Sequence, residues 1–164
     1  MELIDKVYRF VSYRPRSEKE IRDYLHGKHA SERDFEKITN QLRKQKLLDD
    51  SAFVKWWLEQ RATFRPKGKR ALRAELKQKG ISDELIEEAL SEDVDDLAQA
   101  KKAIQKKLKI YDRLPYLERK AKLSAFLARN GFSWEIIKQV VNQLNTEKEK
   151  QAYSRAVVEK YRQV

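Results

Sequence analysis

LRAELKQKGIS at residues 72–82 is one copy of a passage that the chain contains three times; the others are IRDYLHGKHAS at 21–31 and LSAFLARNGFS at 123–133. Each copy starts 51 residues after the one before it. One of the chain's three prolines precedes each copy: Pro15, Pro66 and Pro115. Self-similarity at such a period is typical of repeat architectures, in which each repeat is one small supersecondary unit.

Each repeat is predicted to form three helices. In the middle repeat, the first helix runs from about residue 50 to 62 and ends before Pro66, because the residue before a proline disfavours the helical region. The second runs from about residue 67 to 79, and Gly80 supplies its left-handed C-terminal cap. Ser82 caps the third helix. The apolar residues recur at helical spacing: Phe53, Val54, Trp57, Leu58, Leu72, Leu76, Leu85, Ile86, Ala89 and Leu90.

The first repeat departs from the other two at one position. His29 stands where they have Gly80 and Gly131. Histidine tolerates the left-handed region better than most residues, so we expect the turn to be kept at some cost in free energy. Ser17 and Glu20 have the spacing of a capping box for the second helix of this repeat.

The predicted fold is all-α: a tandem array of three three-helix repeats in an elongated, curved stack, followed by a C-terminal helix. The repeats are assigned to residues 1–48, 49–92 and 93–145, and the tail to residues 146–164. Tyr153, Val157 and Tyr161 in the tail have four-residue spacing. They indicate either a repeat-like helix that caps the stack or an amphipathic helix unrelated to the repeats.

The composition excludes several classes of protein. The chain has 164 residues, of which 38% are charged, and no cysteine, so neither a disulfide framework nor a thiolate metal site is possible. No apolar run approaches the roughly 20 residues that span a bilayer. The N-terminal MELIDKVYRF is amphipathic and carries acids, unlike a signal peptide. We expect a cytoplasmic protein without a membrane partner.

Basic and acidic blocks alternate along a chain of net charge +11. Residues 61–79 contain eight basic residues and one acid, Glu75, whereas residues 83–96 contain eight acids and no base. A basic block can meet a polyanion, and an acidic block can meet a basic protein surface. The acidic block also fits a solvated face or an intramolecular partner of the neighbouring basic block.

The middle repeat resembles the RecX family of recombinase regulators. LLDDSAFV at residues 47–54 is followed by Gly68-x3-Leu72-x2-Glu75-Leu76-x2-Lys79-Gly80-Ile81. The similarity covers about residues 3–145. It implies a regulatory protein of homologous recombination, DNA repair and the SOS response. Such a protein binds the RecA recombinase filament on single-stranded DNA and modulates, most often inhibits, its ATPase and strand-exchange activity.

Two rows of basic residues are candidate contacts for the filament or for nucleic acid. Single-stranded DNA would be bound either directly or through the filament. One lies on the second helix of the middle repeat and the other on the first helix of the third repeat, beside an apolar row. The predicted binding residues are Arg65, Lys67, Lys69, Arg70, Arg73, Lys77, Lys102, Lys106, Lys109 and Arg113. The alternative is that these residues only keep the helices soluble.

Aromatic residues beside the basic rows are candidates for base stacking. Trp57 shares the face of Phe53 and is predicted to be core, whereas Trp56 is predicted to be partly buried where two repeats meet. Phe64 is expected to pack at the hinge before Pro66, and the same role is expected for Tyr111 and Tyr116 near Pro115.

No enzyme is predicted. Asp49 and Asp50 stand at a helix start, where capping explains them better than metal binding. His26 and His29 lack partners for a zinc site, and no phosphate-binding loop or nucleophile elbow is present. We expect a monomer without a cofactor. Two other functions remain open: a general nucleic-acid-binding helical repeat without a recombinase partner, and a protein-binding helical adaptor.

Overall fold

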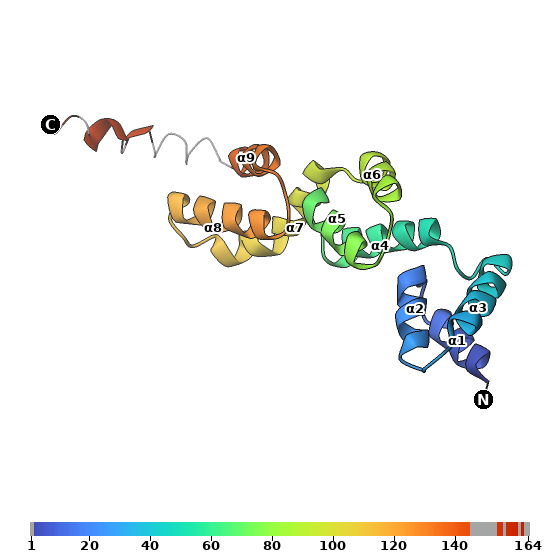
Figure 1. Ribbon diagram of the computed structural model, residues 1–164. Coiled ribbons are helices and arrows are strands. Elements are labelled where there is room, and N and C mark those ends of the chain that lie inside the picture. Colours follow the sequence, from blue (N-terminus) through green and yellow to red (C-terminus); the bar gives the residue numbers. More distant parts are fainter. Residues whose placement is uncertain (1, 145–153, 156, 161, 163–164) are drawn as a thin grey trace. The chain divides into compact units, whose positions relative to one another are not determined.

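The computed structural model describes residues 2–144, 154–155, 157–160 and 162 (Figure 1). Between residues 3 and 143 it contains nine α-helices and no strand, which confirms the all-α prediction. The helices are α1 (Leu3–Ser12), α2 (Glu18–His26), α3 (Glu32–Lys44), α4 (Asp50–Phe64), α5 (Lys69–Gln78), α6 (Asp83–Glu92), α7 (Asp96–Tyr111), α8 (Tyr116–Arg129) and α9 (Trp134–Gln143). Tyr153 and Tyr161 of the predicted C-terminal helix lie outside the described residues.

Serine side chains cap the third helix of each three-helix group. Ser31, Ser82 and Ser133 stand 51 residues apart at the starts of α3, α6 and α9. Each hydroxyl accepts a hydrogen bond from the backbone N–H three residues further on. Ser17 and Glu20 form the predicted capping box at the start of α2. The helix starts therefore follow directly from local sequence.

A residue with positive φ follows the second helix of each group, two or three residues after the helix ends. The angle is +58° at His29, +77° at Gly80 and +85° at Gly131. The prediction that His29 keeps the left-handed turn is therefore confirmed. Lys46, after α3, also has a φ of +58°, which the sequence analysis did not anticipate.

Each group of three helices has its own apolar core. The first consists of Val7, Ile21, Leu25, Phe35, Ile38, Leu42 and Leu48. The second consists of Phe53, Val54, Leu58, Leu72, Leu76, Ile81, Ile86, Ala89 and Leu90. The third consists of Ala100, Ile104, Leu123, Leu127, Phe132, Ile137, Val140 and Val141. Burial of these side chains is the main force that holds each group together.

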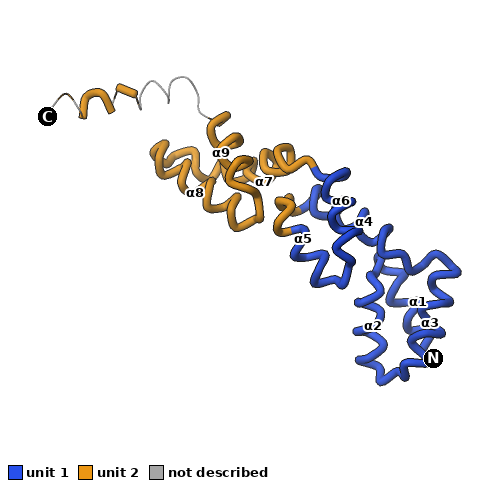
Figure 2. The backbone as a smooth tube through the Cα atoms, turned by 45° about the horizontal axis from the view of Figure 1, so that its top comes forward, with its two compact units in different colours: residues 1–64, 72–94 blue, residues 65–71, 95–164 orange. Residues whose placement is uncertain are grey.

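The chain divides into two compact units, which are described separately (Figure 2). Unit 1 comprises Met1–Phe64 and Leu72–Val94, and unit 2 comprises Arg65–Ala71 and Asp95–Val164. Among the described residues, no helix is both long enough and apolar enough to cross a membrane.

Candidate interaction surfaces

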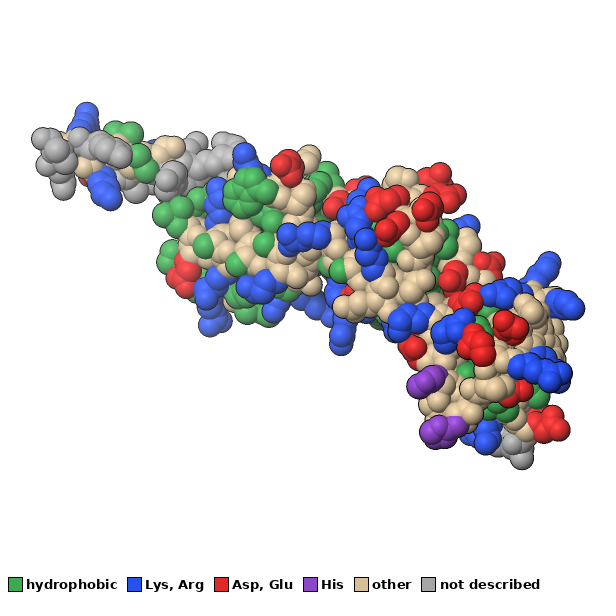
Figure 3. All heavy atoms as spheres, viewed as in Figure 1, with side chains coloured by type: hydrophobic (Ala, Val, Ile, Leu, Met, Phe, Trp, Pro, Cys, Tyr) green, Lys and Arg blue, Asp and Glu red, His purple; other side chains and the backbone are tan. Residues whose placement is uncertain are grey.

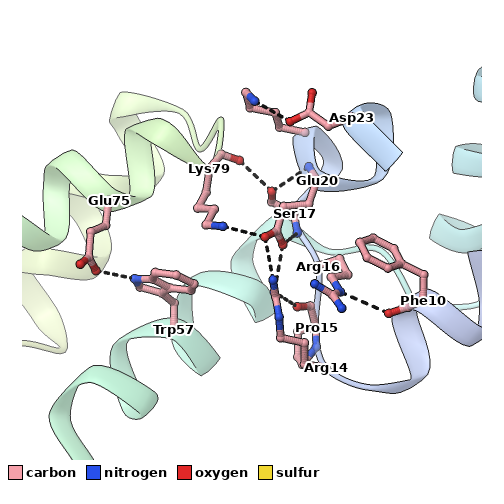
Figure 4. A network of polar contacts seen from close by, with 11 residues as sticks. Phe10, Arg14, Pro15, Arg16, Ser17, Glu20, Asp23, Trp57, Glu75 and Lys79 are labelled. Atoms are coloured by element: carbon pink, nitrogen blue, oxygen red, sulfur yellow. Dashed lines mark hydrogen bonds and ion pairs between the residues drawn. The ribbon is translucent and has the colours of Figure 1, made fainter. Parts of the chain in front are cut away.

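In unit 1, a polar network joins the start of α2 to the end of α5 (Figure 4). The Ser17 hydroxyl donates a hydrogen bond of 2.7 Å to the carbonyl oxygen of Lys79. The Lys79 ammonium donates to Glu20 Oε1 at 2.8 Å. The Arg14 guanidinium binds both oxygens of the same carboxylate, at 2.7 and 2.9 Å. One carboxylate thus accepts charge-assisted bonds from two cations, one on each side of this junction.

The environment of Glu20 keeps its carboxylate ionised. Burial opposes ionisation, but the hydrogen bonds from Arg14 and Lys79 outweigh it and lower the pKa to about 2. The side chain is only 13% exposed. This pair of contacts is therefore better shielded from water than the ion pairs on the outer helix faces, whose contribution to stability is small.

Trp57 belongs to the same junction. Its indole N–H donates to Glu75 Oε2 at 3.0 Å, and Arg61 Nε donates to the same oxygen at 2.8 Å. The Arg61 guanidinium and the Lys79 ammonium lie 4.6 and 5.2 Å from the ring centroid. Trp57 packs against the second core, as predicted, but it is half-buried rather than fully buried, because its indole N–H needs a polar partner.

Trp56 is half-buried as well, and the Arg14 guanidinium lies 5.3 Å from its ring centroid. Arg14 precedes α2 and Trp56 lies on α4, so the prediction of partial burial between two repeats is confirmed. Both indoles are engaged within unit 1.

In unit 2, the equivalent junction is made by backbone. The N–H of Gly68 donates to the carbonyl oxygen of Asn130 at 2.9 Å. A Cβ on Gly68 would lie 2.3 Å from the Gly131 oxygen, and a Cβ on Gly131 would lie 2.4 Å from the Ala71 Cβ. Only glycines permit this close approach of residues 68–71 to the end of α8.

The two junctions are equivalent in the repeat. Gly68 and Asn130 each stand 51 residues after Ser17 and Lys79. A serine hydroxyl makes the contact in one case and a peptide N–H makes it in the other.

Aspartates at the starts of α4 and α7 reinforce both junctions. Asp50 Oδ1 accepts from the N–H of Glu18 at 2.9 Å, and Asp96 Oδ1 accepts from the N–H of Lys69 at 3.0 Å. Each therefore caps the second helix of the preceding group rather than its own. Asp49 caps α4 itself by accepting from the N–H groups of Ser51 and Ala52. The predicted capping of α4 is confirmed for Asp49, whereas Asp50 caps α2, which the sequence did not reveal.

The basic row on α5 is largely neutralised by acids of α6. Arg73 makes two hydrogen bonds to Glu87, at 2.6 and 2.8 Å. This pairing lowers the pKa of Glu87 and raises that of Arg73. The Lys77 ammonium lies 2.9 Å from Asp83. The interpretation of the acidic block as an intramolecular partner of the basic block is confirmed for these two pairs.

The other predicted cations near α5 lie in unit 2. Arg70 donates to the carbonyl oxygen of Ala128 at 2.9 Å, at the end of α8. Arg65 is exposed, whereas Lys67 and Lys69 are half-buried. Phe64, which was expected to pack at the hinge, is 72% exposed, so that prediction is wrong.

The basic row on α7 lies on the outside of its helix. Lys102, Lys106, Lys109 and Arg113 are exposed. The predicted apolar row beside them packs on the third core: Leu97, Ala100, Ile104, Leu108 and Tyr111. No described acid forms an ion pair with Lys106, Lys109 or Arg113. Figure 3 shows acids gathered over α6 and basic side chains along the α7–α8 edge of unit 2.

An exposed isoleucine lies within the α7 row. Ile110 is 63% exposed and stands four residues after Lys106, so these two side chains are neighbours on the surface of α7. The α7 row, defined as Lys102, Lys106 and Lys109 on α7 together with Arg113 just after it, is therefore a basic surface with an exposed apolar side chain beside it. Sequence analysis missed Ile110, although its spacing from the cations was readable.

Models of three protein domains match the chain in order. The model of the first three-helix domain of RecX matches residues 4–42, that of the second matches residues 49–90 and that of the third matches residues 93–141. The chain belongs to the RecX family.

Relatives in the RecX family have the name regulatory protein RecX. The protein of Prosthecochloris aestuarii is 33% identical over 148 residues, which cover 87% of this chain and 93% of that protein. The protein of Streptococcus uberis is 35% identical over 139 residues, which cover 84% of this chain and 54% of that protein. The chain spans about half the length of this and several other relatives that it matches.

Solved RecX structures share the fold. A crystal structure of regulatory protein RecX has a TM-score of 0.72 and 28% identity, over 85% of this chain and 71% of that one. RecX from Lactobacillus salivarius has a TM-score of 0.73 over 86% of this chain and 93% of that one, at 24% identity. The three-helix groups described above are therefore the domains of a family of regulatory proteins.

Proposed function

We propose that the chain binds the RecA recombinase filament on single-stranded DNA and inhibits its ATP hydrolysis and strand exchange. Membership of the RecX family of regulatory proteins carries this proposal. A chain bound along the filament would obstruct the subunit movements on which ATP turnover and DNA exchange depend.

The α7 row is the surface that suits a nucleoprotein filament best. Its three lysines extend along about 10 Å of helix and Arg113 follows the helix end, so the four cations can meet phosphates or acidic side chains. Ile110 beside the row suits a protein partner, because protein interfaces combine apolar side chains with polar ones. Arg73 and Lys77 on α5 contribute less, because Glu87 and Asp83 already offset their charge.

The test is a titration of this protein into RecA filaments assembled on single-stranded DNA. ATP hydrolysis and co-sedimentation are measured at each step. We expect inhibition near stoichiometric amounts. The triple variant Lys106→Glu, Lys109→Glu, Arg113→Glu should lose at least about tenfold in filament affinity, since three contacts become repulsive. The matched control is Arg33→Glu, Lys37→Glu, Lys44→Glu on the exposed face of α3. The absence of both inhibition and co-sedimentation would refute the proposal.

Two further variants separate the filament from bare nucleic acid. Ile110→Ala should weaken binding to the filament and leave binding to the uncoated single strand unchanged. Arg73→Ala with Lys77→Ala should cost less filament affinity than the α7 triple variant. Equal binding to coated and uncoated strands would instead favour a general nucleic-acid-binding protein.

A further inference from the structure

A second basic surface lies in unit 1, away from every residue of the α5 and α7 rows in sequence. A cavity of about 280 Å³ opens between α1 and the C-terminal end of α2. Its lining consists of three cations and three aromatic residues: Lys6, Arg9, Phe10, Tyr13, Tyr24 and Lys28. No acid lines it. Packing explains Tyr24, which lies against the first core and stacks on Phe10, but not the exposed Tyr13 ring beside three cations.

Local structure fixes the rings of this cavity. The rings of Phe10 and Tyr24 stack at 4.3 Å with 9° between their planes. The Arg16 guanidinium lies 3.8 Å from the Phe10 centroid and covers its other face. Tyr13 differs from both, because its side chain is 70% exposed at the end of α1. Its hydroxyl accepts a hydrogen bond from Arg9 Nε at 3.3 Å, which holds the ring at the cavity's edge.

The cations surround these rings on two elements. Lys6 and Arg9 share one face of α1 with Tyr13, at spacings of three and four residues. Lys28 follows α2 and lies 5.6 Å from the centroid of the Tyr24 ring. All three are exposed. A ligand in the cavity therefore meets positive charge from both sides and one available ring.

This chemistry matches a nucleotide. Phosphates are neutralised by lysine and arginine. The flat face of any of the bases can stack on an aromatic ring. The volume is just below the roughly 300–1,000 Å³ of pockets for drug-sized ligands, so it suits a single nucleotide. An acidic peptide would satisfy the cations but would leave the exposed Tyr13 ring without a role.

We propose that this cavity binds one unpaired nucleotide of a single-stranded nucleic acid. Tyr13 stacks on the base, while Lys6, Arg9 and Lys28 contact the flanking phosphates. The site needs no recombinase, and its test is separate from that of the filament-binding proposal.

The test uses the full chain and an oligo(dT) single strand without recombinase. Tyr13→Ala should lower the affinity about 5- to 150-fold, the range that loss of one stacked base produces. Tyr13→Phe keeps the ring but removes the hydroxyl that accepts from Arg9, so it should lose far less affinity than Tyr13→Ala. Lys6→Gln with Lys28→Gln should reduce the slope of log K against log salt by about 0.7 for each lost phosphate contact. Lys37→Gln with Lys44→Gln on α3 is the matched control and should leave the slope unchanged.

Photocrosslinking supplies a second, direct measurement. A single strand that contains 5-iodouracil should crosslink to Tyr13, whereas a fully paired duplex of the same sequence should not. The proposal is overturned if the crosslinks map only to unit 2, or if Tyr13→Ala binds the single strand as tightly as the wild type. It is also overturned if polyglutamate displaces the strand from wild type and from Tyr13→Ala equally well. Circular dichroism confirms that each variant is folded.

Discussion

At the scale of single residues, the positive φ at the end of α2, α5 and α8 has a different cost in each group. Glycine adopts this conformation freely, so Gly80 and Gly131 carry no strain there. At His29 a side chain in the left-handed region costs conformational free energy, although histidine adopts this region more readily than most residues. Gly131 has a second constraint, because Ala71 occupies the space that a side chain would need.

We expect Gly131→Ala to lower the free energy of unfolding by at least about 2 kcal/mol. The left-handed conformation alone costs an alanine roughly 1–2 kcal/mol, and its Cβ would also overlap the backbone of Ala71. Gly27→Ala is the matched control, because Gly27 has a φ of −63° and a Cβ there would meet only ordinary contacts at 3.5 Å. That variant should be neutral or more stable by about 0.4–1 kcal/mol.

Urea denaturation followed by circular dichroism measures both variants. A Gly131→Ala variant as stable as Gly27→Ala would show that the end of α8 can move away from residues 68–71 without cost.

At the scale of helices, the starts of α2 and α5 depend on carboxylates from the next group. Asp50 and Asp96 each cap a helix to which they do not belong. Burial raises the pKa of both carboxyl groups, and the backbone hydrogen bond that each accepts only partly offsets it. The charge of these two residues therefore costs stability while their acceptor oxygen contributes to it.

Substitutions of Asp50 separate these two effects. Asp50→Ala removes the acceptor and should lower stability by about 1 kcal/mol, as expected for a lost helix cap. Asp50→Asn keeps an acceptor oxygen without the charge and should be as stable as the wild type at pH 7, or more stable. Because the folded-state pKa of Asp50 lies above its ordinary value of 3.8, its contribution to stability falls as the pH rises through this region, so the stability of Asp50→Asn relative to the wild type should rise with pH.

Thermal denaturation at pH 4 and pH 7 tests this expectation. Asp96→Ala and Asp96→Asn provide the same comparison in unit 2. If Asn and Ala variants are equally unstable at both positions, the ionised form of the carboxylate is required and the interpretation fails.

Elements that sequence predicted well are those set by neighbouring residues. Serine caps, glycine turns and apolar spacing act over three or four positions, so they located most helices of the described chain. The Glu20 network was not predictable, because Lys79 lies 59 residues away and only the folded chain brings them together. The α5 row was overestimated for a similar reason: Glu87, 14 residues after Arg73, is its partner across two helices.

At the scale of the whole molecule, positive charge dominates but is unevenly balanced. The chain carries 37 lysines and arginines against 26 acids. Most described ion pairs are well exposed and add little stability. Glu20 and Glu75 are exceptions, with side chains only 13% and 16% exposed, and at Glu20 the hydrogen bonds from two cations outweigh burial and lower the pKa to about 2.

Acid should therefore destabilise unit 1 through Glu20. Since its folded-state pKa lies below the ordinary value of 4.5, its contribution is complete above that pH and is lost as the pH falls toward about 2. The loss is on the order of 2 kcal/mol once partial exposure is allowed for. Glu20→Gln should remove this part of the pH dependence, whereas Glu36→Gln on the exposed face of α3 should not. Urea midpoints measured between pH 2 and pH 6 decide the matter, and parallel profiles for wild type and Glu20→Gln would refute it.

The two equivalent junctions tolerate opposite kinds of mutation. At Ser17 the contact is a hydroxyl, so any substitution that deletes this oxygen breaks it. At Gly68 the contact is the peptide itself, which almost every substitution retains, yet every added side chain collides with Gly131. The Ser17 contact is lost when side-chain atoms are removed, and the Gly68 contact is lost when side-chain atoms are added. Two equivalent positions of the repeat are therefore restricted in opposite ways: position 17 needs a side-chain hydroxyl, and position 68 needs the absence of a side chain.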